Sequence, residues 1–104
     1  MAGPGGIFKS GEFNEVNDKF YLTGALTVGT TEIEAKVGAS RAENRQRLRI
    51  YNNSNSTIYF GPSGVTSATG EPLLKKQWIE LEIGDIGVFL IAGSGGNNVR
   101  IQEI

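Results

Sequence analysis

The residue types that most often do chemistry in proteins are scarce in this chain. It has no cysteine and no histidine among its 104 residues. Without cysteine there is no thiolate nucleophile, no disulfide framework and no cysteine-based zinc site. Without histidine the commonest general base near neutral pH, which is also the commonest transition-metal ligand, is missing. Enzymatic chemistry would have to use carboxylates, hydroxyls, lysines or arginines, and we expect neither an enzyme nor a cofactor or metal site.

Two pairs of glutamates have a spacing that could bring carboxylates together. Glu80 and Glu82, like Glu32 and Glu34, are separated by one residue, and alternate residues of a strand share a face about 7 Å apart. Carboxylates at that distance could serve a glycosidase-like reaction or bind calcium. Alternating glutamates are also typical of the solvated face of an ordinary sheet, and this is the role that we expect.

The one local concentration of positive charge is a run of arginines. It comprises Arg41, Arg45, Arg47 and Arg49. Tyr51 and Tyr59 could add the aromatic stacking that single-stranded nucleic acids need, but a net charge of −1 gives no long-range attraction to a polyanion. We therefore expect these arginines to form intersubunit ion pairs or a solvated face, and we predict that Arg45, Arg47 and Arg49 contact a protein partner.

The only tryptophan stands on the polar side of a predicted strand. In residues 77–83 the apolar Ile79, Leu81 and Ile83 alternate with Trp78 and two glutamates, which predicts a strand with Trp78 on the face opposite the aliphatic stripe. Because tryptophan is enriched at interfaces, Trp78 is the strongest single contact candidate. The alternative is that Trp78 packs beneath residues 61–72 or beneath the N-terminal residues.

Residues 1–19 show neither helical nor strand periodicity and are rich in glycine and polar residues. We predict a flexible N-terminal arm over 1–19 and a single β domain over 20–104. Phe8 and Phe13 would dock on a neighbouring subunit or a larger assembly, and the alternative is a disordered terminus. The start of the chain has no secretory signal, and no apolar run is long enough to cross a membrane, so we expect a soluble protein made in the cytoplasm.

The centre of the chain carries the clearest pairing signal. In residues 45–61, two runs rich in β-branched and aromatic residues flank the polar insert NNSNS, which predicts a hairpin with a longer loop. Leu48 and Ile50 would then meet Ile58 and Phe60 across the pair, with Tyr51 near Tyr59 on the other face.

Alternation predicts further strands over residues 20–28, 32–37, 77–83, 86–92 and 99–104. Residues 86–92 are apolar on both faces, so that strand should be covered on both sides. Residues 38–44 could hold one helical turn, and residues 61–72 form a long glycine- and proline-punctuated loop. The fold class is therefore all-β, a compact antiparallel β-sandwich or jelly-roll-like barrel of about seven or eight short strands.

Residues 26–104 resemble a known group of proteins in the order of their motifs. The matching segments read LTVGTTEIEAKVG, then RQRLRIYNNSNSTIYFGPSGVTSATGEPL, then WIELEIGDIGVFLIAGSGGNNVRIQEI. They resemble small all-β virion proteins of tailed bacteriophages. The resemblance implies a structural particle protein, such as a capsid decoration protein, the base of a head fibre, or a small neck or tail component.

On this basis we expect a non-enzymatic cement protein on the phage virion. It would bind the major capsid protein on the outer surface of the mature head and stabilise the lattice as a homo-oligomer, with a trimer as the first choice. One alternative is a neck, tail or fibre component in low copy number. Another is a carbohydrate-binding module that stacks sugars on Trp78, Tyr51 and Tyr59.

Overall fold

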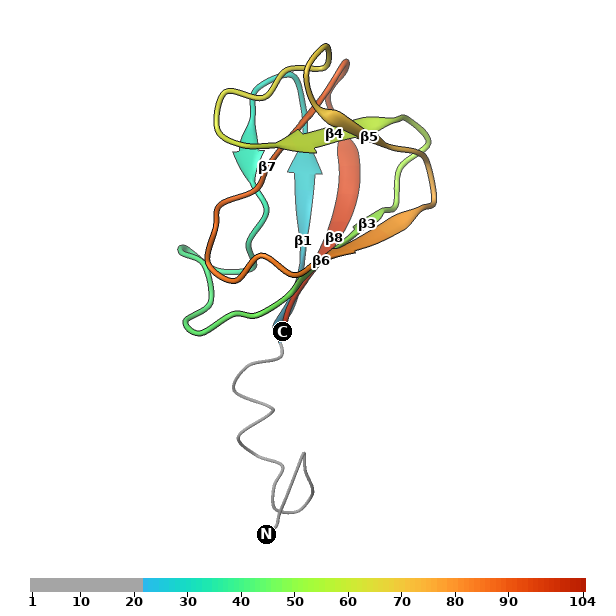
Figure 1. Cartoon of the computed structure of the whole chain (residues 1–104). Coiled ribbons are helices and arrows are strands. Elements are labelled where there is room, and N and C mark those ends of the chain that lie inside the picture. Colours follow the sequence, from blue (N-terminus) through green and yellow to red (C-terminus); the bar gives the residue numbers. More distant parts are fainter. Residues whose placement is uncertain (1–21) are drawn as a thin grey trace, which may run out of the picture.

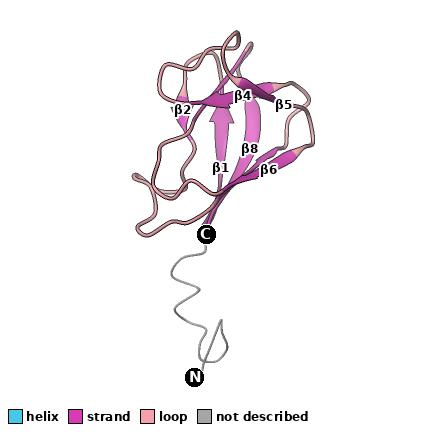
Figure 2. Ribbon diagram, viewed as in Figure 1, coloured by secondary structure: helices cyan, strands magenta, loops and turns pink. Residues whose placement is uncertain are grey.

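The structure of the protein is a computed structural model that describes residues 22–104, and this part of the chain is all-β. Strands joined by turns and loops make up the described residues, without a helix among them (Figure 2). The strands are β1 (Leu22–Val28), β2 (Ile33–Glu34), β3 (Leu48–Asn52), β4 (Ile58–Gly61), β5 (Glu71–Leu73), β6 (Trp78–Leu81), β7 (Phe89–Ala92) and β8 (Asn97–Glu103). The predicted arm, with Phe8 and Phe13, lies outside the described residues.

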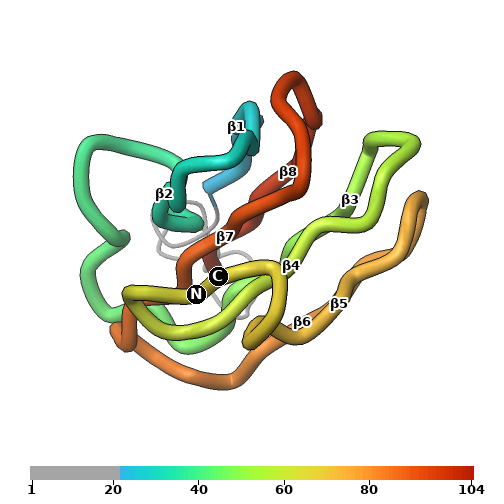
Figure 3. Tube along the Cα trace, turned by 90° about the horizontal axis from the view of Figure 1, so that it is seen from above, coloured from blue at the N-terminus to red at the C-terminus, as the bar shows by residue number. Residues whose placement is uncertain are grey.

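The eight strands form two antiparallel four-stranded sheets, as the predicted fold class required. Sheet A has the order β1-β8-β3-β6 and sheet B the order β2-β7-β4-β5, and the view from above shows β7 between β2 and β4 (Figure 3). Each early strand pairs with a late one in nested fashion: β1 with β8, β2 with β7, β3 with β6 and β4 with β5. This is the strand order of a jelly roll. The chain passes repeatedly between the two layers, and β4 crosses the direction of β1 and β8 in Figure 1.

The core lies between the two sheets and follows from alternation along the strands. In β8, Val99 and Ile101 are fully buried while the residue between them faces outward, and in β3 the same holds for Leu48 and Ile50. Sheet B supplies Ile58 and Leu90, both fully buried. Partly buried Phe60, Ile79 and Leu81 pack against this cluster. Side chains from both sheets therefore close one apolar interior.

The predicted hairpin of β3 and β4 is wrong. The two strands belong to different sheets, so the NNSNS segment crosses between layers and Tyr51 and Tyr59 lie on different sheets. Asn52 explains the crossing: its buried amide donates to the carbonyls of Ser56 and Leu73 at 2.8 and 2.9 Å. Its side-chain oxygen accepts the amide proton of Ser54 at 3.0 Å. These bonds satisfy backbone groups of the crossing segment and tie it to Leu73 in β5.

Other boundaries differ from the predictions in ways that local physics explains. β5 was not predicted because it contains Pro72, which cannot donate a backbone hydrogen bond. β5 is an edge strand of sheet B, however, so Pro72 can pair with Tyr59 through one side only. β7 covers just the second half of the predicted strand 86–92, and Ile86 before it is 66 % exposed.

Two shorter segments also differ from the predictions. β2 spans only Ile33–Glu34 of the predicted strand 32–37. Residues 38–44 form bends and turns and contain no helical turn. β8, in contrast, begins two residues before the predicted strand 99–104 and lies between β1 and β3. It is therefore a central strand of sheet A.

The loop between β4 and β5 is anchored to the rest of the fold. Glu32 accepts the amide proton of Gly64 at 2.7 Å and the hydroxyl proton of Ser63 at 3.3 Å. Val65 is buried beneath the loop. A Cβ atom on Gly70 would come within 2.8 Å of Tyr59 and Val65, so only glycine fits there. The loop is thus a packed element of sheet B.

The crossing between β3 and β4 gives a stability prediction. Replacing Asn52→Ala leaves the carbonyls of Ser56 and Leu73 without this donor, and we expect a loss of about 2–3 kcal/mol in the free energy of unfolding. Urea denaturation measures it. The matched control is Asn55→Ala, an exposed residue of the same turn, which should change the free energy by less than about 0.5 kcal/mol. Equal effects of the two substitutions would contradict the role of Asn52.

Candidate functional site

The outward side chains of sheet A form two rows that run across its strands, and we call this surface the platform. Strand register places Ala25, Arg100, Tyr51 and Trp78 opposite one another in the first row. The second row contains Thr23, Gln102, Arg49 and Glu80. The backbone of every member is paired with one or two neighbouring strands. The positions of the two rows are therefore fixed by the sheet and not by loops.

The platform is hollowed between the two rows. The hollow has a volume of about 330 Å³ and is lined by Thr23, Arg49, Tyr51, Trp78, Arg100 and Gln102. Trp78 is 59 % exposed, as predicted from its place opposite the aliphatic stripe. The guanidinium carbon of Arg49 lies 5.0 Å from the centre of the Trp78 ring, which is a cation–π contact. Aromatic surface and hydrogen-bonding groups therefore share one concave site.

Arg49 is oriented by its neighbours in the second row. Its Nη2 donates to Oε1 of Glu80 at 2.8 Å, and its Nη1 donates to Oε1 of Gln102 at 3.3 Å. Arg47 donates to the other Glu80 oxygen at 3.3 Å. The hydrogen bond from Arg49 is the main reason that the pKa of Glu80 lies below its usual range, partial desolvation opposes it, and Arg47 adds to the lowering. Glu80 thus holds two arginines and is not a proton donor near neutral pH.

Arg100, in the first row, has no carboxylate among the described residues within ion-pair distance. Its Nε donates to Oδ1 of Asn98 at 3.1 Å, and the same oxygen accepts a hydrogen bond from Asn53 at 2.9 Å. Lys76 approaches this end of the platform, where its Nζ donates to the Asn53 carbonyl at 3.2 Å. On the first-row side, the platform therefore carries exposed positive charge that no carboxylate of the described residues neutralises.

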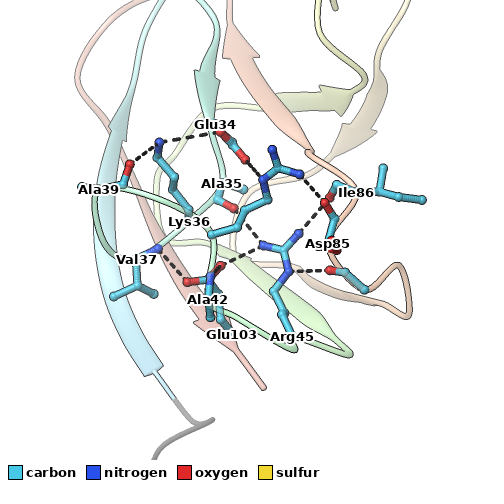
Figure 4. A network of polar contacts seen from close by, with 12 residues as sticks. Glu34, Ala35, Lys36, Val37, Ala39, Ala42, Arg45, Asp85, Ile86 and Glu103 are labelled. Atoms are coloured by element: carbon cyan, nitrogen blue, oxygen red, sulfur yellow. Dashed lines mark hydrogen bonds and ion pairs between the residues drawn. The ribbon is translucent and has the colours of Figure 1, made fainter.

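Arg45 does not belong to this surface, which corrects its placement among the exposed contact residues. Its side chain is fully buried and forms an ion pair of 2.8 Å with Glu103, whose side chain is also fully buried. Its Nε donates to the Gly84 carbonyl at 2.7 Å and its Nη2 to the Ile86 carbonyl at 2.8 Å (Figure 4). Of the other predicted contacts within the described residues, Arg49 and Trp78 line the platform, and Arg47 reaches Glu80 in its second row.

The buried pair organises a network at one end of the sandwich. Glu103 accepts the amide protons of Val37 at 3.0 Å and of Ala42 at 3.2 Å. Nearby, Arg41 pairs with Glu34 at 2.7 Å and donates to the Asp85 carbonyl. Both oxygens of Glu103 and all three nitrogens of the Arg45 guanidinium group have partners. The network therefore serves structure, because neither buried side chain has an atom left to act on a substrate.

The other candidate carboxylates either have partners within the protein or lie apart from one another. Glu34 pairs with Arg41, while Glu32 binds the loop after β4, so these two do not act as a pair. Glu82 follows the end of β6 and lines a separate small hollow with Gln46 and Arg47. Among residues 22–104, no group of three or more potential ligands could hold a metal ion. A larger hollow of about 530 Å³, beside residues 40–44 and Asp85, has no aromatic lining.

Sequence reasoning missed Arg100, Gln102 and Thr23 as parts of the platform. Alternation did predict that Arg100 and Gln102 share the polar face of the last strand. The sequence does not predict that β8 lies between β1 and β3. This position brings Arg100 and Gln102 beside Tyr51 and Arg49. Register across strands far apart in the sequence was the missing information.

The buried ion pair gives a second stability prediction. Glu103→Leu leaves the Arg45 charge buried without its carboxylate, and we expect a loss of about 3–5 kcal/mol in the free energy of unfolding. The double substitution Arg45→Met with Glu103→Leu should cost less than the sum of the two single ones in a urea-denaturation cycle. As control, Arg47→Met breaks an exposed pair and should cost less than about 1 kcal/mol. Additive effects in the cycle would show that the two side chains are not coupled.

The Arg49–Glu80 contact gives a prediction about pH. Since the pKa of Glu80 is lowered in the folded protein, the contact contributes stability above the pKa of the unfolded chain and loses it as the pH falls through the lower, folded value. Arg49→Gln should raise the pKa of Glu80 toward the ordinary value for a glutamate, as measured by NMR titration of its carboxyl carbon. Arg41→Gln, which touches Glu34 and not Glu80, should leave that titration unchanged. No shift with Arg49→Gln would contradict the assigned cause.

No helix in the described part of the chain is long and apolar enough to cross a membrane. Comparisons of the chain with protein-family models, with curated proteins and with solved structures find no match.

Proposed function

We propose that this chain is a non-enzymatic structural protein of a tailed-phage particle, a decoration protein that binds the major capsid protein on the outer surface of the head. The observation that carries the proposal is Trp78, 59 % exposed on the face of a paired sheet and stacked on Arg49. A tryptophan held open to solvent in this way is suited to protein contact. We assign the contact to the platform.

The platform has the composition of an interface centre. Trp78, Tyr51, Arg49 and Arg100 belong to the residue types that dominate binding energy at protein interfaces. Because strand pairing and the Glu80 contacts already fix Arg49, little side-chain freedom would be lost on binding. In contrast, one outward row of sheet B contains the uncharged Ile91, Tyr59 and Pro72, and the next row places Glu34 opposite Phe89.

The mechanism of stabilisation is mass action. A protein that binds only the assembled lattice lowers the free energy of that lattice relative to its separate subunits. Many copies, each with a modest interface, add their contributions, and a homo-oligomer that engages several capsid subunits at once binds more tightly than one copy. A trimer is our first choice of oligomer. The motif resemblance over residues 26–104 supports the particle assignment, and jelly rolls recur in viral capsid proteins, although they also recur in lectins.

Carbohydrate binding is the second candidate. The specific observation that favours it is the hollow of the platform, and jelly rolls also occur in lectins. Sugars stack on aromatic rings, and the hollow places Trp78 and Tyr51 beside polar side chains that could hydrogen-bond hydroxyl groups. Its volume of about 330 Å³ lies at the lower end of the range for small-ligand sites. A fluorescence titration of Trp78 with a panel of oligosaccharides tests this candidate, and no spectral response across the panel would remove it.

Copy number separates the particle roles. Particles of the phage that encodes this chain would be purified on a density gradient, and the chain quantified against the major capsid protein by mass spectrometry. We expect one copy per capsid subunit or per few subunits. A few copies per particle would replace decoration with a neck, tail or fibre role, and absence from particles would overturn the proposal.

A substitution tests the contact face directly. Trp78→Ala should weaken binding to particles that lack this protein by about thirtyfold, because a central interface tryptophan contributes about 2 kcal/mol or more. Co-sedimentation with the particles measures the affinity, and thermal unfolding checks that the fold is retained. The control is Tyr59→Phe on sheet B, which should bind like the parent protein. If Trp78→Ala also binds like the parent protein, the platform is not the contact face.

A further inference from the structure

The charges of the platform are distributed unevenly. Glu80 accepts hydrogen bonds from both Arg47 and Arg49, so this part of the second row is already neutralised in part. On the first-row side of the platform, Arg100 and Lys76 have no carboxylate within ion-pair distance among the described residues. Among the described residues, Arg100 donates to an asparagine side chain and Lys76 donates to a backbone carbonyl, and neither acceptor is charged.

The uncompensated cation lies directly beside the aromatic surface. Arg100 is the cross-strand neighbour of Tyr51, and Tyr51 is the cross-strand neighbour of Trp78. All three side chains line the same hollow. Within residues 22–104, Asn98 accepts a hydrogen bond from the Nε of Arg100, which orients the group, and the two terminal nitrogens of Arg100 have no partner. A guanidinium group in that state can bind a carboxylate through two parallel hydrogen bonds.

We infer that the partner of the platform is an acidic protein surface that places an aspartate or glutamate carboxylate on Arg100 and an adjacent apolar side chain on Trp78 and Tyr51. This inference rests on the proposed function, since it names the chemistry of the capsid surface that the platform receives. Lys76 adds attraction on the same side of the platform. Charge complementarity gives register and speed of association, while the aromatic residues supply the buried area.

A carboxylate partner fits better than a neutral one. Burying Arg100 against an uncharged surface would remove water from its charge without compensation, which is costly. An aspartate or glutamate compensates the charge and matches the planar geometry of the guanidinium group. An apolar side chain beside that carboxylate is expected because Trp78 is exposed. Contact with apolar atoms would bury its ring and exclude water from the ion pair between Arg100 and the partner.

The test uses the full chain, with Trp78 as the only tryptophan and hence the only indole fluorophore. The probe is the purified particle of the encoding phage, stripped of this protein. Affinity would be measured by co-sedimentation for the parent protein, Arg100→Gln and Arg100→Glu. We expect about tenfold weaker binding for Arg100→Gln and at least a hundredfold for Arg100→Glu. Arg41→Gln, which removes an arginine outside the platform, is the matched control and should bind like the parent protein.

Salt provides the second readout. Raising NaCl from about 0.05 to about 0.5 M should weaken binding of the parent protein, and the dependence should be shallower for Arg100→Gln because one screened pair is gone. If Arg100→Gln and Arg100→Glu bind like the parent protein, the inference is overturned while the proposed function stands. If only Trp78→Ala weakens binding, the partner is apolar and the acidic assignment fails. If the parent protein does not bind particles at all but its fluorescence responds to oligosaccharides, the proposed function fails as well.

Discussion

The ion pair between Arg45 and Glu103 is the interaction on which the arrangement of the sandwich depends. The two residues are 58 positions apart in the sequence and meet with no exposure to solvent. Around them, three segments that are not strands donate or accept backbone hydrogen bonds: the turn before β7, the residues after β2 and the connection that leads to β3. Because the sheet ladders do not reach these segments, the pair supplies polar partners to their partly buried backbone groups.

β8 connects this buried network to the platform. Its inward residues include Glu103, Val99 and Ile101, and its outward residues include Arg100 and Gln102. Alternation along one strand therefore fixes both the interior and the exposed face, and the position of β8 between β1 and β3 makes it a neighbour of most of sheet A. A change that shifted the register of β8 by one residue would bring Arg100 into the core and Glu103 onto the surface.

The sequence predicted what depends on local alternation and failed where distant pairing decides. The all-β class, the outward Trp78 and the buried stripe of β3 follow from a period of two residues. A polar insert between two apolar runs has the same local pattern whether the two strands pair with each other or belong to different sheets. The sequence therefore could not distinguish a hairpin from the observed crossing at Asn52. Arg45 was expected at the surface because arginine is seldom fully buried, and its partner stands far away in the sequence. Nothing in the order of residues alone places Arg100 beside Tyr51.

The central position of β8 also governs when the protein can acquire its structure during synthesis. β1 and β3 leave the ribosome well before the strand that lies between them, and they cannot complete sheet A without it. Contacts between residues far apart in the sequence form slowly, since the chain must close a long loop before the contact stabilises it. A nascent chain that has not yet reached β8 lacks Arg100 and Gln102 as well as the buried carboxylate. Synthesis of β8 therefore completes the interior and the platform together, because sheet A stays open until the strand between β1 and β3 is available.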